Sequence, residues 1–343
     1  MPETPIGGEF EIYAADFGQS AGVGAWPVFP GHDLVRCDTG RSALTLVLAD
    51  WRARRPRAAT VWLPHYVCPS VVAAAQASGL AVAWYDDLPG RGGALPPAAD
   101  DDIVLTVHYF GFPNPAVATL GPRRWALIED AVQAPYTAGI GAAGDYVIAS
   151  LRKWWQAPDG AVAGARLPWL MPVELAASDE AFLSQRLAAK LLRGTRGGDD
   201  RFLGWIARSE DALAPSVPRR VSWLSTTLLA AVDPADAAAR RRANWAALAG
   251  GLAGVVPLYP GLPEGVVPLA FPVVVADGRR DALRRHMAAR AIFCPVHWAD
   301  LTDPPASARA LADAILSLPI DQRYGLADMR RILDGLALFS AGT

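Results

Sequence analysis

Two kinds of hydrophobic pattern alternate between about residues 33 and 165. Short runs of apolar and β-branched residues predict buried strands at 60–63, 81–85, 103–107, 125–128 and 146–149. Longer segments with helical periodicity predict helices at 40–54 and 69–77, the second of which is closed by Gly79. Strands that alternate with helices indicate βαβ units, so we predict an α/β fold with a mostly parallel central sheet.

The pattern restarts towards the C-terminus. Helices are expected at 185–193, 236–252, 280–290 and 327–336, with strands at 269–275 and 292–295 and a glycine-rich loop at 194–200. We therefore predict three parts: an N-terminal segment at 1–30 that wraps over the large domain, a large domain at 31–235, and a smaller C-terminal α/β domain at 236–343.

Composition narrows the class of protein. The 343 residues correspond to roughly two domains, and 52% hydrophobic with 19% charged residues excludes a disordered chain. Apolar runs fall well short of the roughly 18 residues of a membrane span, and the start lacks the pattern of a signal peptide. The net charge of −2 without a basic run argues against nucleic-acid binding, and three cysteines fit a cytoplasmic protein.

Polar and aromatic residues follow the predicted strands where each strand ends. In an open α/β sheet, ligands bind at the carboxyl ends of the strands. The residues at these strand ends include His65, Tyr66 and Cys68, then His108, then Asp130 and Gln133, and finally Ser150 and Lys153. The set therefore predicts a ligand site at this edge of the sheet.

The lysine and the aspartate of this set suit pyridoxal phosphate (PLP). A lysine amine condenses with the aldehyde of PLP, and an aspartate pairs with its protonated pyridine nitrogen. The chain has only two lysines, Lys153 and Lys190, and Lys190 lies at a helical position where we expect a solvent-exposed face. The Gly40 turn opens a helix whose N-terminal amides can either hold a phosphate or be capped locally.

Five segments resemble those of the DegT/DnrJ/StrS-type PLP-dependent aminotransferases of fold type I. They read, in order, TGRSAL, LPHYVCPS, VHYFGFP, LIEDAVQA and GDYVIASLRKWWQAPDG, and the later ARRRANWAAL and LSLPIDQRY are similar too. The resemblance spans about residues 30–335. It implies a PLP fold type I architecture, with a large PLP-binding domain and a smaller C-terminal domain.

The resemblance also implies roles for individual residues. Lys153 would hold PLP and move the proton of the reaction, Asp130 would bind the pyridine nitrogen, and Gln133 would hydrogen-bond near the phenolic oxygen. The phosphate would lie against Gly40, the Arg41 and Ser42 amides and the Ser150 hydroxyl. His108 would lie under or beside the cofactor, and either Tyr66 or Cys68 would lie near the ring face.

By the same resemblance, the protein is a cytoplasmic aminotransferase that works as a homodimer with a shared active site. It would move an amino group from an amino acid, glutamate in the first instance, to a keto acceptor such as a nucleotide-linked keto-sugar. The sequence departs from the family in three places. Ser150 and Lys153 are closely spaced, Asp159-Gly160-Ala161 replaces Glu-Gly-Gly, and Ser222, Ser225 or Thr226 stands where an asparagine reaches the neighbouring subunit.

Other motifs have competing interpretations. Residues 139–144 fit G-x-G-x-x-G, but no strand precedes them, so we interpret them as a glycine-rich turn. His65 with Cys68 and Cys294 with His297 have zinc-ligand spacing but lie in different predicted domains. We expect His297 to line the substrate cleft. Arg323 either binds a substrate carboxylate or forms an ion pair in domain packing.

Two alternative functions stay open. One is another fold type I PLP enzyme that acts on a small amino acid or amino alcohol. The other is a non-catalytic scaffold or regulator that keeps the fold and has lost the chemistry. The joint presence of Lys153, Asp130 and Gln133 argues against the second.

Overall fold

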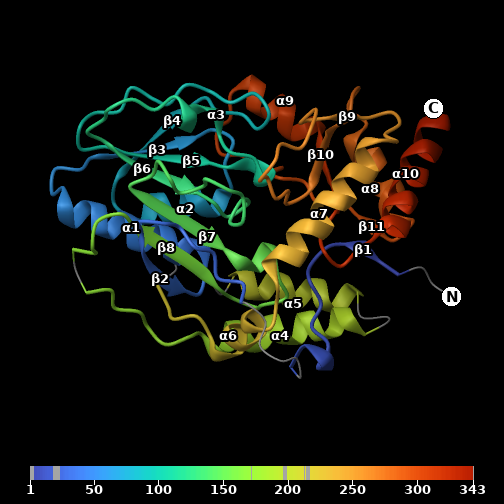
Figure 1. Ribbon diagram of the computed structural model, residues 1–343, viewed down its shortest axis with the longest axis horizontal. Coiled ribbons are helices and arrows are strands. Elements are labelled where there is room, and N and C mark those ends of the chain that lie inside the picture. Colours follow the sequence, from blue (N-terminus) through green and yellow to red (C-terminus); the bar gives the residue numbers. More distant parts are fainter. Residues whose placement is uncertain are drawn as a thin grey trace.

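Seven strands form a central sheet in the computed structural model, which describes residues 4–17, 24–170, 172–195, 199–211, 213 and 217–342 (Figure 1). In spatial order the strands are β2 (Asp33–Cys37), β8 (Ala161–Ala165), β7 (Tyr146–Ser150), β6 (Ala126–Asp130), β5 (Ile103–Val107), β3 (Thr60–Pro64) and β4 (Ala81–Tyr85). Strands β3 to β7 are mutually parallel, whereas β8 is antiparallel to both of its neighbours.

The sequence pattern predicts β3 to β7 to within one or two residues of their observed bounds, but it does not predict β2 and β8. Strand β8 has the sequence AVAGA, whose alanines and glycine have little preference for strands, and β2 is partly exposed and polar. Residues 151–160 connect β7 to β8 without a crossover helix, which is why β8 turns back antiparallel. This connection carries Lys153 at the carboxyl edge of the sheet.

Two helices pack against the central sheet. Helix α1 (Gly40–Arg54) contacts β7, β8 and α2 (Pro69–Ala77), and both helices have the bounds expected from the sequence. Thr39 caps α1 by accepting the Ser42 N–H at 3.2 Å, and a proline opens α2 at its first turn. The short elements on this part of the chain are η2 (Tyr109–Gly111), α3 (Pro115–Ala118) and η3 (Leu151–Lys153).

A second layer of strands and helices forms the C-terminal part of the molecule. Strands β9 (Val256–Pro257), β10 (Phe271–Val274) and β12 (Ile315–Leu318) make an antiparallel sheet in the order β12-β10-β9. The accompanying helices are α7 (Pro234–Ala249), α8 (Arg280–Ala288), α9 (Ala306–Ala314) and α10 (Leu326–Ala341). The large sheet uses residues 33–165 and this sheet uses 256–318, while the domain boundary at 235 stays a prediction.

The N-terminal segment lies partly elsewhere than expected. Its strand β1 (Ile6–Gly7) pairs with β11 (Ile292–Phe293) of the C-terminal part, so the segment joins both parts instead of only covering the large one (Figure 1). Gly7 has φ 86°, and a Cβ there would lie 2.1 Å from the Phe293 carbonyl oxygen, so only glycine fits this pairing. The 3-10 turn η1 (Ala14–Phe17) follows.

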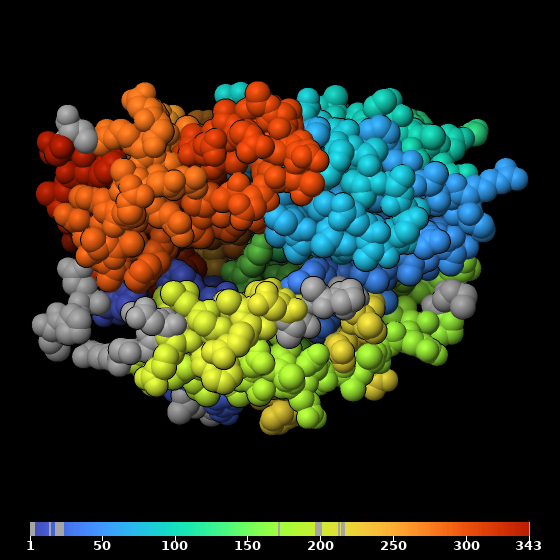
Figure 2. Space-filling view, turned by 180° about the vertical axis from the view of Figure 1, so that it is seen from behind, coloured from blue at the N-terminus to red at the C-terminus, as the bar shows by residue number. Residues whose placement is uncertain are grey.

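Helices α4 (Glu180–Gly194) and α5 (Asp199–Asp211) form a pair beside the sheet, followed by α6 (Trp223–Ala230). Part of the predicted loop at 194–200 lies outside the described residues. Figure 2 shows the pair in yellow and yellow-green, below both the C-terminal residues in orange and the N-terminal half in blue, with a hollow where the three meet. None of the helices in the described ranges has the length and apolar character needed to cross a membrane.

Candidate functional site

A cavity of about 340 Å³ lies at the carboxyl ends of β6 and β7, beside the start of α1. Asp130 ends β6 and Ser150 ends β7, and these two strands are parallel neighbours, so both residues come to the same edge of the sheet. The residues predicted for the site that line this cavity are Gly40, Arg41, Cys68, Asp130, Gln133, Ser150 and Lys153. The topology thus brings together most of the set found at the strand ends.

Asp130 is a buried carboxylate in the wall of the cavity. One of its oxygens accepts the Val132 N–H at 2.9 Å. Burial raises the pKa of Asp130 above its ordinary value of 3.8, while this hydrogen bond and the charge of Lys153 act in the opposite direction. A buried acid of this kind is stabilised in its charged form when a cation is bound next to it.

Gln133 leaves one polar group without a protein partner. Its Oε1 accepts the Phe110 N–H at 2.7 Å, which turns the amide nitrogen away from that backbone. The Nε2 group is buried and has no hydrogen-bond partner among the described residues. Because a buried donor without an acceptor is costly, a cavity ligand with an oxygen at this position fits the site.

The start of α1 forms another wall. A Cβ at Gly40 would lie 3.5 Å from the Ser150 Cβ, so the helix N-terminus and the Ser150 side chain are adjacent. Ser42 does not line the cavity, because it is fully buried and its N–H is already capped by Thr39. The Arg41 side chain turns to Glu210 at 2.7 Å. The expectation that the Ser42 amide holds a phosphate is therefore not met in this conformation.

Lys153 lies in η3 just after β7, and its amine points into the same space. Its Nζ is 5.6 Å from the centre of the Trp298 ring, which also lines the small cavity. Lys153 lines a second, larger cavity of about 910 Å³ as well. The lysine therefore lies where the two cavities meet.

The structure distinguishes Cys68 from Tyr66. Cys68 lines the cavity, with its Sγ 3.1 Å from the Ser70 Oγ. Tyr66 is fully buried behind it, where its ring packs against Trp298 at 5.8 Å and its hydroxyl donates to the His297 carbonyl. The aromatic side chain that reaches the cavity is Trp298 and not Tyr66.

His108 does not lie beside the cavity, so this expectation is corrected. Its Nδ1 accepts the Asn114 N–H at 3.0 Å, and its Nε2 therefore donates to Glu129 Oε2 at 2.8 Å. Successive strand residues face opposite sides, so Glu129 and its partner His108 belong to the face of β6 opposite to Asp130. His108 is a buried structural partner of Glu129.

The G-x-G-x-x-G segment also binds Glu129. The N–H groups of Gly141, Ala143 and Gly144 donate to its two carboxylate oxygens at 2.8, 2.9 and 2.5 Å. This segment is the glycine-rich turn that the sequence predicts, and its amides are occupied by a carboxylate of the same chain. Across the described ranges, no group of three or more possible metal ligands is present, so the zinc interpretation gains no support.

His297 lines the larger cavity next to Lys153. Its Nδ1 lies 3.0 Å from the Ser317 Oγ, and its ring meets the edge of Phe110. Burial, together with the nearby charge of Lys153, lowers the pKa of His297 to about 3. The imidazole is therefore neutral at physiological pH and can act only as a neutral donor or acceptor towards a bound molecule.

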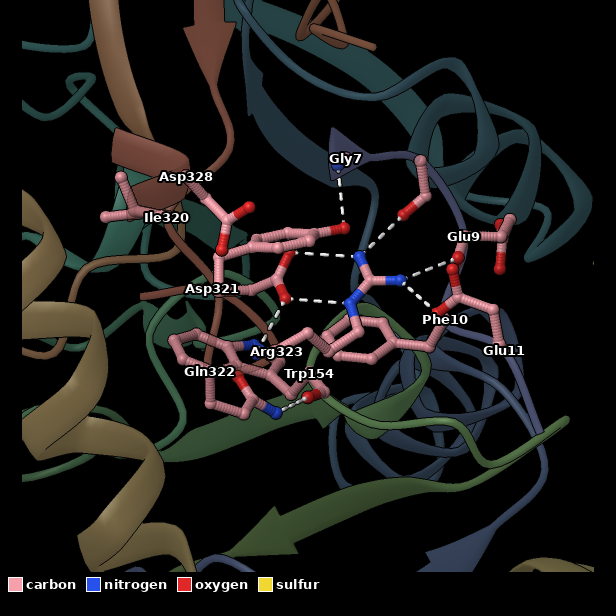
Figure 3. Close-up of polar contacts among 12 residues, drawn as sticks. Gly7, Glu9, Phe10, Glu11, Trp154, Ile320, Asp321, Gln322, Arg323 and Asp328 are labelled. Atoms are coloured by element: carbon pink, nitrogen blue, oxygen red, sulfur yellow. Dashed lines mark hydrogen bonds and ion pairs between the residues drawn. The ribbon is translucent and has the colours of Figure 1, made fainter. Parts of the chain in front are cut away.

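Arg323 lines neither cavity, so a role in binding substrate is corrected to one in packing. Its guanidinium donates to both oxygens of Asp321, to Glu11 at 2.6 Å, and to the Gly8 and Glu9 carbonyls (Figure 3). Figure 3 shows Asp321 on one side of the guanidinium and Glu9 and Glu11 on the other. The side chain ties the N-terminal segment to the C-terminal part and has no free edge for a ligand.

Lys190 is also placed differently from the expectation. It is almost fully buried, not on a solvated face, and its Nζ donates to Glu9 at 3.2 Å and to the Phe10 carbonyl at 3.1 Å. Burial lowers the pKa of Lys190 to about 8, although the charge of Glu9 opposes this shift. It does not line either cavity.

A group of charges beside the cavity, with largely buried cations and partly exposed carboxylates, is not predicted by the sequence analysis. The group, called here the cation cluster, consists of Arg41, Arg152, Arg186, Lys190, Glu9 and Glu210. Its members come from the N-terminal segment, α1, η3, α4 and α5. The sequence places Arg152 next to Lys153 and Arg41 at the start of a helix, but the members of the cluster meet only in the folded chain.

Three hydroxyl residues, one of which the sequence analysis expects in place of an asparagine of the resembled family, form hydrogen bonds within this chain. The Ser222 Oγ donates to Asp159 at 2.7 Å, the Asp159 N–H donates to the Ser225 Oγ at 3.1 Å, and the Thr226 hydroxyl donates to the Ser222 carbonyl. Asp159, which replaces a glutamate of the resembled family, thus anchors the start of α6.

Comparison with solved structures identifies the fold. A putative sugar aminotransferase from Streptococcus pneumoniae in its PLP form matches over 99% of both chains, with a TM-score of 0.65 and 12% identity. DesI, solved in the presence of its TDP-sugar product, matches over 98% of this chain and 93% of its own, with a TM-score of 0.64 and 17% identity. A DegT DnrJ EryC1 StrS aminotransferase from Brucella abortus matches over 90% of this chain and 87% of its own, with a TM-score of 0.57 and 17% identity.

No protein-family model matches the sequence, and no curated protein is significantly similar to it. At identities this low the likeness concerns the backbone arrangement and not the substrate. The chain therefore has the fold of the fold type I aminotransferases, and in particular of the sugar aminotransferase structures named above.

Proposed function

We propose that this protein is a PLP-dependent aminotransferase that moves an amino group from an amino acid, glutamate in the first instance, to a keto acceptor. The observation that carries the proposal is the convergence of Asp130, the unpartnered Gln133 Nε2 and Lys153 on one cavity beside a helix N-terminus. The fold is shared with structures described as PLP-form aminotransferases. The cavity is of a size that suits a small aromatic cofactor.

Different residues of the cavity would bind different parts of the cofactor. Asp130 would pair with the pyridine nitrogen, and Gln133 Nε2 would donate to the ring oxygen. Gly40 and Ser150 would hold the phosphate at the start of α1, where backbone N–H groups and the helix dipole favour an anion. The Trp298 ring and Cys68 would border the faces of the ring.

Lys153 is the residue that would take part directly in the reaction. When bound, PLP supplies an aldehyde for amine capture and a ring that withdraws electrons from the reacting carbon. The Lys153 Nζ, at the junction of the two cavities, would anchor the cofactor and then move a proton between neighbouring atoms of the substrate. His297, neutral because of its lowered pKa, would contribute to the wall of the substrate cleft without adding charge.

The proposed acceptor is a nucleotide-linked keto-sugar bound in the larger cavity. Its volume of about 910 Å³ lies in the range of pockets that enclose a molecule of this size. The sequence resemblance and the similarity to DesI, whose structure was solved in the presence of its TDP-sugar product, both favour this substrate class. A small amino acid or amino alcohol would leave most of this cavity unfilled.

We further propose a homodimer in the cytoplasm, as the resemblance implies. Trp223, at the start of α6, is 80% exposed, and Val217 nearby is also exposed. Large apolar side chains on a surface are typical of contacts between protein chains. Sedimentation analysis of the PLP-loaded protein tests this, because a monomer that is fully active would contradict a shared active site.

The deciding experiment for the cofactor is the visible absorption spectrum of the purified protein with PLP, followed by borohydride reduction and peptide mapping. We expect a yellow protein in which reduction fixes the cofactor to Lys153, and a Lys153→Ala variant without this attachment. Lys190→Arg is the matched control, because it removes the only other lysine and keeps its charge. A wild type that stays colourless with PLP would remove the aminotransferase proposal and favour a scaffold role.

A donor panel then separates the remaining alternatives. Conversion of the cofactor by glutamate or glutamine supports the sugar aminotransferase proposal, and transfer of the amine to nucleotide-linked keto-sugars identifies the acceptor. If only small amino acids or amino alcohols react, the alternative fold type I enzyme is correct.

A further inference from the structure

The cation cluster carries more positive than negative charge. Among the described residues it combines four cations, Arg41, Arg152, Arg186 and Lys190, with the two carboxylates of Glu9 and Glu210, which leaves two positive charges uncompensated within it. The cations are largely buried, whereas the side chains of Glu9 and Glu210 are 31% and 41% exposed. An excess of charge on largely buried cations is costly unless a further counter-ion is bound.

The contacts within the cluster show where this excess lies. Glu210 accepts from Arg41 at 2.7 Å, from Arg186 at 3.0 Å and from Arg152, while Glu9 accepts from Arg186 at 3.3 Å and from Lys190 at 3.2 Å. Each carboxylate is thus shared by at least two cations. Burial acts to raise the pKa of Glu9, but the charges of Lys190, Arg186 and Arg152 outweigh it and lower this pKa to about 2.

Two arginines of the cluster retain unused donors. The Nε groups of Arg152 and Arg186 are buried without a partner in the part of the chain that the structure describes, and the Arg186 side chain is only 4% exposed. The negative charge of Asp159 also raises the pKa of Arg152, but only at longer range. The Asp159 oxygens accept hydrogen bonds from the Ser222 N–H and hydroxyl instead. The guanidinium groups are therefore not saturated by the carboxylates around them.

The position of the cluster relates it to the substrate. Arg41, Arg152, Arg186, Glu9 and Glu210 line the small cavity, and of these Arg152 and Glu9 also line the larger one. The third residue that lines both is Lys153. Arg152 thus lies at the junction of the cavities, where any substrate that reacts at the Lys153 amine must be bound.

We propose that Arg152 and Arg186 bind the carboxylate of the amino donor, and that Glu9 and Glu210 compete with this carboxylate for the two arginines. In an α-amino acid the carboxylate is bonded to the same carbon as the amino group. A donor whose amine reacts near Lys153 therefore presents its carboxylate to the adjacent cations, and guanidinium groups pair well with carboxylates. Gly40 and Ser150, which line only the small cavity, remain available for the cofactor phosphate.

This inference rests on the proposed function, but its test does not require turnover. The test measures the binding of glutarate, a dicarboxylate without an amine, to the PLP-loaded full-length protein by titration calorimetry. Glutaramide, in which both carboxylates are replaced by amides, is the control ligand. We expect glutarate to bind and glutaramide not to bind.

Removal of a cation and removal of a carboxylate should have opposite effects on glutarate binding at an anion site, but not at a structural ion pair. Arg186→Gln removes one donor and should weaken glutarate binding about tenfold or more, since a hydrogen bond between charged groups is lost. Glu9→Gln removes the competing carboxylate and should strengthen binding. Arg186→Lys should restore part of the affinity, and Arg208→Gln, at an exposed position on α5, should have no effect. If the Arg186–Glu9 ion pair were only structural, Arg186→Gln and Glu9→Gln would both weaken glutarate binding, and the proposal would be wrong.

Two further outcomes are decisive. If Arg152→Gln and Arg186→Gln weaken PLP affinity and leave glutarate affinity unchanged, the cluster serves the cofactor phosphate and the proposal is overturned. Glutarate that does not bind to the folded wild type overturns it too, even where glutamate reacts. If glutarate binds with the expected pattern but no amino donor converts the cofactor, the carboxylate site stands and the proposed aminotransferase function fails.

Discussion

Gln133 accepts the Phe110 N–H through its Oε1 at 2.7 Å, and this single hydrogen bond determines which end of the Gln133 amide faces the cavity. Phe110 has φ 56°, an uncommon backbone conformation for a large side chain, so its N–H direction is fixed by the local fold. The Nε2 donor is left towards the proposed cofactor. Under the proposed function, the two ends of this side chain would serve stability and cofactor binding separately.

Substitution of Gln133 should separate these two roles. In Gln133→Glu an oxygen still accepts the Phe110 N–H, but the donor is replaced by a second acceptor, so PLP affinity should fall about tenfold or more. In Gln133→Leu both groups are lost, so the free energy of unfolding of the apo-protein should also fall by about 1–3 kcal/mol because the Phe110 N–H is buried unpaired. PLP titration and urea denaturation measure the two effects. A Gln133→Glu variant that binds PLP as tightly as the wild type would contradict the role assigned to Nε2.

Removal of the Asp130 charge should stabilise the apo-protein but impair the PLP-loaded protein. Burial raises the pKa of Asp130, so the folded protein disfavours its charged form relative to the unfolded chain. Asp130→Asn keeps the oxygen that accepts the Val132 N–H and removes this charge. The apo-protein should therefore become more stable at pH 7, as urea denaturation would show.

The same substitution should impair the loaded protein. Loss of the charge-assisted contact with the pyridine nitrogen should weaken PLP binding or slow the donor half-reaction by about 10- to 100-fold. Single-turnover absorbance measurements with glutamate test this. A variant that is less stable as the apo-protein and fully active when loaded would place Asp130 in a structural role.

The buried pair of His108 and Glu129 predicts a specific dependence of stability on pH. Burial acts to raise the pKa of Glu129, but the hydrogen bond from His108 and those from the 141–144 turn outweigh it, and the net pKa lies below the ordinary 4.5. Because the folded state binds this proton more weakly than the unfolded chain, the stabilisation is complete above about pH 4.5 and is lost as the pH falls through the folded pKa.

Glu129→Gln removes this dependence. The variant should be less stable than the wild type by about 2 kcal/mol at pH 7, because charge-assisted hydrogen bonds to a buried carboxylate are lost. The difference should shrink as the pH falls below 4.5. Urea denaturation across this range measures it, with the exposed Asp100→Asn as the control. A difference that stays constant with pH would show that the Glu129 charge contributes nothing.

Arg323 and Glu11 should contribute to stability as one unit. Arg323→Met removes the contacts that hold the N-terminal segment against the C-terminal part, and should lower the free energy of unfolding by about 2 kcal/mol. Glu11→Gln should destabilise less, and the double variant should lose less than the sum of the two. A double-mutant cycle by urea denaturation tests this. Fully additive effects would mean that the two side chains do not interact.

The strand pattern shows how much of the fold the sequence determined. Strands β3 to β7 and helices α1 and α2 follow from the local pattern of apolar residues. Buried parallel strands are short continuous apolar runs, whereas the helices that cover them have apolar residues at helical spacing. The order of parallel strands then placed Asp130, Gln133, Ser150 and Lys153 at one edge. The candidate cofactor site was predictable to this extent without coordinates.

The tertiary structure decided what depends on contacts between distant segments. It placed β2 and β8 in the sheet, put Cys68 and not Tyr66 on the cavity, and moved His108 to the opposite face of β6. Nothing in the local pattern of α4 distinguishes a buried Lys190 from an exposed one. Its environment is set by Glu9, about 180 residues earlier in the chain.

The cation cluster illustrates the physical reason. Local hydrophobic periodicity reports which side of an element is buried, and it is set by neighbours a few residues apart. The net charge of such a cluster depends on which carboxylates of remote segments approach which cations. The sequence therefore determined the sheet and the position of Lys153, and only the folded chain determined that Arg152 beside it shares the Glu210 carboxylate with other cations and keeps an unpaired Nε donor.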